Sequence, residues 1–129
     1  MIYIADVVGI ISDKIQRLLG CTIPGDEKIY LGQSNIAHMK ARHWEDYQKY
    51  GSCIPEIIRL PDYIGRNPAD DSIEYVKEFK IDNEYVKVAV RVASSGKYYA
   101  RSLYVLNHNR VHNFIKKGTL KRVEPWHFP

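Results

Sequence analysis

The first half of the chain carries apolar residues at the spacing of amphipathic helices. We expect three such helices, the last of only one or two turns, at residues 13–19, 34–50 and 54–61. Short runs of β-branched residues favour strands at 2–8 and 29–31. The stretch 62–72 contains Gly, Pro, Asn and Asp residues typical of turns, so we expect mostly loop there.

The second half changes to an alternation of apolar and polar residues, which predicts strands with one buried face. We expect three strands joined by tight turns, at 73–81, 85–93 and 98–106. A last helix should open at Asn107 and end at Gly118, and a loosely held tail should follow. Helices first and a small antiparallel meander of three or four strands afterwards indicate an α+β fold, with N-terminal helices packed on one face of the sheet and the other face open to a ligand.

The segment 34–50 holds the most candidate chemistry, because it carries two of the five histidines and three cationic side chains. Ser34 can cap the start of this helix and Gly51 can end it. On one continuous helix His43 falls on the apolar face and His38 on the polar face, about 140° away. One imidazole is therefore expected against the body of the protein, and the other toward solvent or a ligand.

The length, net charge and cysteine content of the chain indicate the kind of protein and partner to expect. The 129 residues suggest one domain, and a net charge of +4 with a pI near 9.0 favours an anionic partner. Cys21 and Cys53 have no metal-ligand spacing, so we expect reduced thiols and a cytoplasmic location. We expect no signal peptide and no membrane span, because the apolar runs are short.

Both helix histidines have a structural and a chemical interpretation. His43 is either a core histidine satisfied by one hydrogen bond or a general acid or base held between helix and sheet. His38 is either a solvated surface residue or a proton-transfer residue or phosphate contact. The two are not four residues apart, as two metal ligands on one helical face would be, and the sequence shows no phosphate loop, dinucleotide pattern or nucleophile elbow. We therefore expect no metal and no cofactor.

The strands of the second half carry cations and hydroxyls. Lys87 and Arg91 share one strand face about 13 Å apart, and Lys97 and Arg101 follow across the turn. Such cations are either solvated or bind a phosphodiester. Alternation places four side chains on one face of the last strand: Tyr98, Ala100, Ser102 and Tyr104. The tyrosines either pack across strands or stack on bases, and Ser102 is a candidate phosphate ligand.

Together these groups contain the parts of a metal-independent ribonuclease. A histidine would take the proton of a ribose 2′-hydroxyl, a cation would stabilise charge on the phosphate, and hydroxyls would orient the phosphate or protonate the leaving oxygen. Two other classes stay open: a non-catalytic RNA-binding module on the same fold, and a protein-interaction domain of a phage or toxin system. Salt-sensitive binding without cleavage would favour the first, and absence of RNA affinity the second.

Four segments follow one another in a distinctive order. They are the strand, turn and helix of 29–43 with the sequence IAHMKARH, then CIPEIIRLPDYIG at 53–65, VKVAVRVASSGKYYARSLYVLN at 86–107 and HNRVHNFIKKGTL at 108–120. In this order they resemble the phage-type nucleases of the barnase–EndoU–colicin–RelE superfamily. The resemblance covers roughly residues 7–120 and implies one RNase-like domain over 1–120 with a tail at 121–129.

The resemblance also implies an activity and its residues. The implied activity is metal-independent cleavage of RNA to a 2′,3′-cyclic phosphate, in phage proteins or toxin systems. The implied catalytic residues are His38, His43, Arg91, Ser102 and Tyr104, with Lys87 as the runner-up to Arg91. The candidate substrate-binding residues are Arg42, Lys87, Lys97, Tyr98 and Arg101. RNA is the expected partner, with tRNA and an inhibitor or immunity protein as further candidates.

Overall fold

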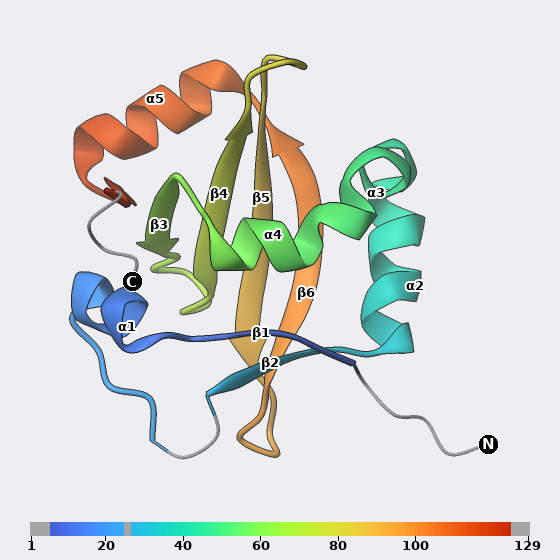
Figure 1. Cartoon of the computed structure of the whole chain (residues 1–129), viewed down its shortest axis with the longest axis vertical. Helices are drawn as coiled ribbons and strands as arrows, with labels where there is room; N and C mark the ends of the chain where they lie inside the picture. Colours follow the sequence, from blue (N-terminus) through green and yellow to red (C-terminus); the bar gives the residue numbers. More distant parts are fainter. Residues whose placement is uncertain (1–5, 25–26, 125–129) are drawn as a thin grey trace.

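The computed structural model describes residues 6–24 and 27–124, which form an α+β fold, as the sequence predicted (Figure 1). The described helices are α1 (Asp13–Leu19), α2 (Gln33–Arg42), α3 (Trp44–Tyr50), α4 (Ile54–Arg59) and α5 (His108–Lys117), and a 3₁₀ turn (Gly51–Cys53) joins α3 to α4. The strands are β1 (Asp6–Ile10), β2 (Lys28–Leu31), β3 (Tyr63–Arg66), β4 (Ile73–Phe79), β5 (Glu84–Val92), β6 (Tyr98–Leu106) and β7 (Leu120–Arg122). Residues 2–5 of the strand expected at 2–8, and residues 125–129 of the expected tail, lie outside the described part of the chain. None of the described helices has the length and apolar character needed to cross a membrane.

The seven strands form one mixed sheet in the order β1-β2-β6-β5-β4-β3-β7. The expected antiparallel meander is its centre, because β4 pairs with β5 and β5 pairs with β6. The sheet is larger than predicted and is not purely antiparallel, since β2 runs parallel to β6. Figure 1 shows β1 and β2 crossing the lower part of the meander.

The two faces of the meander carry different layers. On one face, Val86 and Val88 of β5 are fully buried in the main core together with Ile57 of α4. On the other face, Tyr85 packs in a second apolar cluster with Val111 of α5. The expectation that helices cover only one face is therefore wrong: α5 follows the meander and returns over one end of its far face. The remainder of that face stays open.

The helix expected at 34–50 is broken at His43. α2 ends before this residue and α3 begins after it, and His43 itself has φ −143° and ψ 62°, outside the helical region. α2 lies beside β6, where the short strand β2 leaves most of the β6 edge uncovered (Figure 1). The break ends the periodicity that placed His43 on the packed face, and its side chain is exposed.

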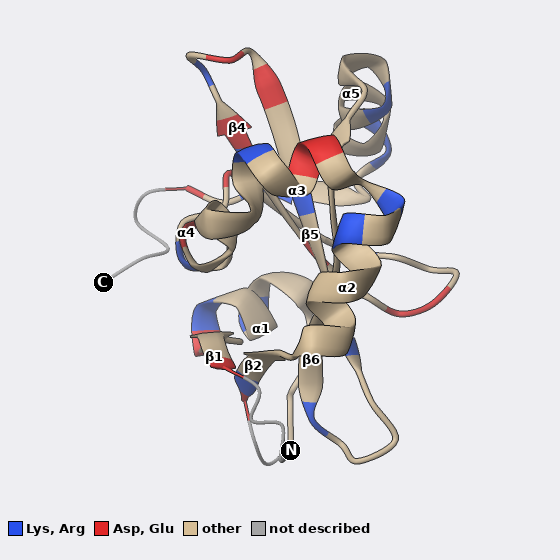
Figure 2. Cartoon of the chain, turned by 90° about the vertical axis from the view of Figure 1, so that its right-hand side faces the viewer, with Lys and Arg blue, Asp and Glu red and all other residues tan. Residues whose placement is uncertain are grey.

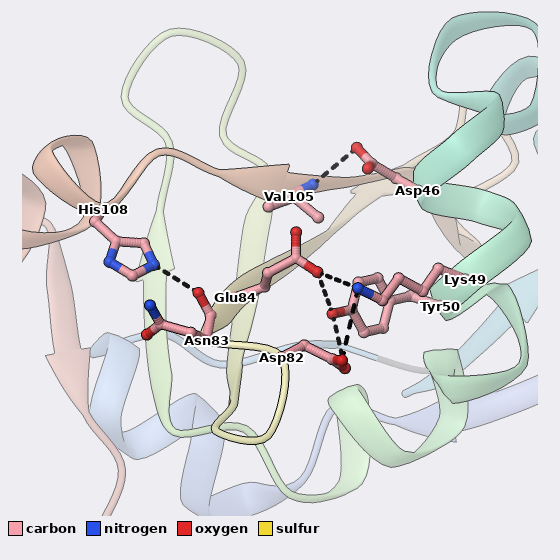
Figure 3. Close-up of polar contacts among 8 residues, drawn as sticks. All are labelled: Asp46, Lys49, Tyr50, Asp82, Asn83, Glu84, Val105 and His108. Carbon is pink, nitrogen blue, oxygen red and sulfur yellow. Dashed lines mark hydrogen bonds and ion pairs between the residues drawn. The ribbon is translucent and has the colours of Figure 1, made fainter.

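Hydrogen bonds and ion pairs connect α3 to the sheet (Figure 3). The Asp46 carboxylate accepts a hydrogen bond of 3.0 Å from the backbone N–H of Val105, a donor on the β6 edge. Lys49 Nζ and the Tyr50 hydroxyl each lie 2.6 Å from Glu84 Oε1 at the start of β5. These contacts hold α3 against the sheet, and with it the junction at His43 where α3 begins.

Two strands were not predicted. β3 lies in the stretch expected to be loop, and β7 lies in the tail expected to be loosely held; they pair with each other, and β3 also pairs with β4. Gly65 permits the close approach, because a Cβ at this position would lie 2.3 Å from the carbonyl oxygen of Thr119. Val123 is buried in the main core, so the folded part of the chain extends beyond residue 120, the expected domain boundary.

A β-bulge in β6 decides which side chains face the open part of the sheet. The pairing of β6 with β5 skips Arg101, an extra residue between Ala100 and Ser102. Alternation is therefore out of phase across the bulge. Tyr99 lies on the same face as Ser102, whereas Tyr98 lies on the core face. The single face predicted for positions 98, 100, 102 and 104 is wrong for this reason.

Candidate active site

A cavity of about 730 Å³ opens on the part of the sheet face that α5 leaves uncovered. Strands β5 and β6 provide its floor, α2 provides one wall, and the turn between β3 and β4 provides another. The cavity has a polar lining, which includes His38, Asp70, Arg91, Tyr99, Arg101 and Ser102. Three segments that are distant in the sequence therefore contribute to one site.

His38 reaches the cavity from α2. This helix begins after Gly32, whose backbone N–H donates to the Asn35 side chain at 2.9 Å. Met39 is 1% exposed and anchors the inner side of the helix in the main core. His38 is turned about 100° from Met39, so its exposed ring faces the cavity and not the core. Figure 2 views the molecule from the side on which α2 lies.

Two guanidinium groups and a hydroxyl lie at the cavity floor. Arg91 belongs to β5, and the bulge brings the neighbouring residues Arg101 and Ser102 of β6 into the same lining. Arg91 Nη1 lies 3.6 Å from Asp70 Oδ2. Hydrogen bonds from the side chain and backbone of Ser72, with a further contribution from Arg91, hold the pKa of the Asp70 carboxyl below its ordinary value of 3.8. The site is therefore cationic, with one ionised carboxylate at its wall.

His43 and Tyr104 form a second group, outside the cavity lining. Their rings are stacked with centroids 4.9 Å apart and an interplanar angle of 27°. Lys87 Nζ lies 4.6 Å from the centre of the Tyr104 ring and 2.7 Å from Glu74 Oε2. Burial opposes the charge on Lys87, but its hydrogen bonds to Glu74 and Tyr104 outweigh this effect and raise its pKa. Lys87 is thus held in a buried ion pair and does not line the site.

Besides Lys87, three more predicted substrate-binding residues lie outside the cavity. Tyr98 packs against the main core, Lys97 Nζ lies 5.2 Å from the centre of the Tyr30 ring, and Arg42 is exposed at the end of α2. The cavity brings together four members of the predicted set: His38, Arg91, Arg101 and Ser102.

Other lining residues were not predicted. Tyr99 lines the cavity in place of the predicted Tyr98, because the alternation of side chains changes phase at the bulge. No local feature of the sequence predicts that bulge. Asp70 and Ser72 come from a turn that the sequence marked only as a connection. The one local signal is the Asp-Asp-Ser run itself, since the Asp70 side chain accepts the Ser72 backbone N–H at 3.0 Å in a local turn.

This arrangement has the chemistry to hold a phosphodiester and move a proton beside it. Guanidinium groups bind phosphate oxygens through paired N–H donors, an imidazole exchanges protons near neutral pH, and hydroxyls can donate to an oxyanion. Within residues 6–24 and 27–124, no group of three or more His, Cys, Asp or Glu side chains is arranged to hold a metal ion.

Comparison with known proteins adds an independent observation. The profile of a family described as phage-Barnase-EndoU-ColicinE5/D-RelE like nuclease3 matches residues 5–113. No curated protein and no solved structure matches the chain. The matched range includes α2, the whole meander and every cavity residue named above. The chain therefore belongs to the phage-Barnase-EndoU-ColicinE5/D-RelE like nuclease3 family, which confirms the resemblance found in its sequence.

Proposed function

We propose that the chain is a metal-independent ribonuclease and that it cleaves RNA in the cavity beside α2. His38 is the general base, Arg91 and Arg101 hold the phosphate, and Ser102 orients it. One observation carries the proposal: these four side chains, from three separate elements, line the same cavity. Membership of a nuclease family supports nucleic acid as the substrate class.

In the proposed reaction, the ribose 2′-oxygen attacks phosphorus while His38 takes the 2′-hydroxyl proton. The bond between phosphorus and the 5′-oxygen breaks, and the Tyr99 hydroxyl donates a proton to that oxygen. Tyr99 then recovers a proton from the His38 imidazolium through water, so both side chains return to their starting states. The products are a 2′,3′-cyclic phosphate and a 5′-hydroxyl end. The two arginines stabilise the charge that develops on the non-bridging oxygens.

The proposal gives His43 a different task from His38. The His43 ring is exposed and stacked on Tyr104, so it can extend that stack to an unpaired base. A role in RNA contact therefore suits His43 better than proton transfer. The proposed substrate is RNA, with tRNA as one candidate target, an inhibitor protein as a candidate partner and the cytoplasm as the expected location.

The test is incubation of purified protein with total RNA in EDTA, with analysis of the cleaved ends. We expect cleavage by the wild type, with 2′,3′-cyclic phosphate termini. His38→Ala should reduce the rate by about 100- to 10,000-fold, the usual effect of removing a general base. His43→Ala is the control, because it removes the other histidine of the same helix pair. This variant should mainly bind RNA more weakly, with a smaller effect on the rate of cleavage.

Two results would contradict the proposed chemistry. One is cleavage by His38→Ala at the wild-type rate. The other is intact RNA after incubation with folded wild-type protein; retained binding would then favour a non-catalytic RNA-binding module. Dependence of cleavage on added divalent metal would overturn the metal-independent mechanism while leaving RNA as the substrate.

A further inference from the structure

The charges of the chain are separated along the sequence. Between Glu84 and Glu124 there are nine lysines and arginines and no Asp or Glu. The acid-free segment contains most of β5, all of β6, α5 and β7. The rest of the chain holds all 15 acidic residues and only 10 cations, so the positive net charge of the protein originates in this one segment. Three of these cations pair with carboxylates: Lys87 with Glu74, Arg91 with Asp70 and Arg122 with Glu124. The exposed remainder favours a polyanion as the partner.

The exposed side of α5 carries part of this charge. Val111 is fully buried beneath the helix, and the opposite side exposes Arg110, Lys116 and Lys117. In the described part of the chain, none of these three cations lies within 4.0 Å of a carboxylate. Lysines in the last turn of a helix also stabilise its dipole, but Arg110 lies in the first turn, where that effect is unfavourable. Arg110 also lies 5.7 Å from the centre of the Phe114 ring in the same helix, so its guanidinium has a contact within α5 but no carboxylate partner. All three charges thus remain available to an anionic ligand.

α5 and the cavity share one face of the sheet. Tyr85 packs beneath α5, and Ala89 lines the cavity. The two residues are four positions apart on β5, so their side chains point to the same side, about 13 Å from each other. Between them lies Lys87, which contacts the Tyr104 ring on which His43 stacks. In Figure 2 the basic segments of α5 and of the end of α2 lie on one side of the molecule, whereas α1, α4 and β1 lie on the other.

We propose that the outer side of α5 binds the sugar–phosphate backbone of a polynucleotide whose reacting nucleotide occupies the cavity. The assignment of the reacting nucleotide rests on the proposed function, whereas the binding surface rests on the charge distribution and the position of α5. Arg110, Lys116 and Lys117 supply the backbone contacts, and the exposed His43 ring supplies a stacking surface between α5 and the cavity. The preferred substrate is therefore a strand several nucleotides long, and a dinucleotide fills only the cavity.

The test compares two variants that remove the same number of positive charges. Arg110→Gln/Lys116→Gln/Lys117→Gln changes the outer side of α5. Lys14→Gln/Arg17→Gln/Arg59→Gln changes α1 and α4, which lie on the other side of the sheet. Fluorescence anisotropy with a labelled 2′-O-methyl RNA 20-mer measures binding without cleavage, and thermal unfolding verifies that both variants fold.

The α5 variant should bind the 20-mer roughly 10- to 100-fold more weakly than wild type at 0.1 M salt. The slope of log affinity against log salt should fall by about 2, because each lost contact with a single-stranded phosphate removes about 0.7. The α1/α4 variant should bind like the wild type. Equal losses of affinity in both variants would mean that only the net charge matters. Wild-type affinity in the α5 variant would mean that α5 does not contact the RNA. Either result overturns the proposal.

The binding test of α5 and the cleavage assay can fail independently of each other. If the wild type cuts no RNA but only the α5 variant loses affinity for the 20-mer, the proposed chemistry fails and the binding surface stands. If the wild type cuts RNA and the α5 variant binds as tightly as the wild type, the chemistry stands and the surface fails. A wild-type protein with no affinity for the 20-mer at low salt would overturn the surface directly.

Discussion

His38 and His43 are five residues apart, and their surroundings differ because the backbone changes direction between them. His38 remains within α2 and lines the cavity, whereas His43 lies at the junction of two helices and stacks on Tyr104. A continuous helix placed His43 against the body of the protein and His38 on the polar face, but in the structure both rings are exposed. Their different contacts give them different expected roles, one beside the phosphate and one beside a base.

The ion pair between Lys87 and Glu74 leads to a prediction on stability. Both side chains are less than 10% exposed, so removal of one partner leaves a buried charge without compensation. Lys87→Met should lower the free energy of unfolding in urea by about 3–5 kcal/mol. The exposed Lys80→Met in the β4–β5 turn is the control and should change it by less than about 0.5 kcal/mol.

The double variant Lys87→Met/Glu74→Gln distinguishes pairing from packing. If the pair accounts for the loss, the double variant should be more stable than the sum of the two single losses predicts. Strictly additive losses would show that the two side chains contribute independently.

At the scale of single elements, periodicity predicted what depends on local pattern and missed what depends on distant contacts. α1 covers residues 13–19, as its apolar spacing predicted; Ser12 caps its start, and Gly20, which has φ 66°, follows its end. β4 and β5 pair without a break in their alternation, whereas β6 departs from its alternation at the bulge. β3 and β7 were missed because each is short and forms only by pairing with the other or with β4. The break at His43 was missed because no Gly or Pro marks it, and Asp46 favours it through a contact with β6.

Gly65 provides a test of the pairing of β3 with β7. A Cβ at this position would lie 2.3 Å from a backbone oxygen and 3.0 Å from the Leu120 side chain, so one strand must move. Gly65→Ala should lower the free energy of unfolding by about 1–3 kcal/mol. Hydrogen exchange should show that amides in β7 lose protection more than those at the centre of β5. An unchanged exchange pattern would mean that the two strands adjust without separating.

On the scale of the whole molecule, the sheet is a platform with its core on one side and its candidate site on the other. The fold class and four cavity residues were accessible from the sequence, because alternation and residue chemistry are local properties. The position of α5 was not accessible, since it depends on how the chain returns after β6. The site therefore combines side chains that the sequence indicated with a shape that only the assembled fold provides.

Acid stability tests the attachment of α3 to this platform. Hydrogen bonds from Lys49 and Tyr50 lower the pKa of Glu84 below its ordinary value of 4.5 (Figure 3). A carboxyl whose pKa is lowered by folding stabilises the protein above the unfolded value, and this contribution disappears as pH falls through the folded value. Glu84→Gln should therefore be less stable than the wild type at pH 7, and the difference should shrink below about pH 4.5.

Urea unfolding at a series of pH values measures this difference. Glu56→Gln, on the exposed side of α4, is the control and should follow the wild-type profile. A difference between Glu84→Gln and the wild type that stays constant from pH 7 to pH 3 would contradict the role assigned to the carboxylate.

The extra residue in β6 has a consequence for how this protein can change in length. Arg101 has no residue opposite it on β5, so deletion of Arg101 would remove the bulge and restore regular pairing. All the remaining β6 side chains would keep the faces that they have now. A one-residue deletion inside a strand normally moves the side chains beyond it to the opposite face of the sheet. Here the fold would be retained, and the only change at the cavity would be the loss of one guanidinium group.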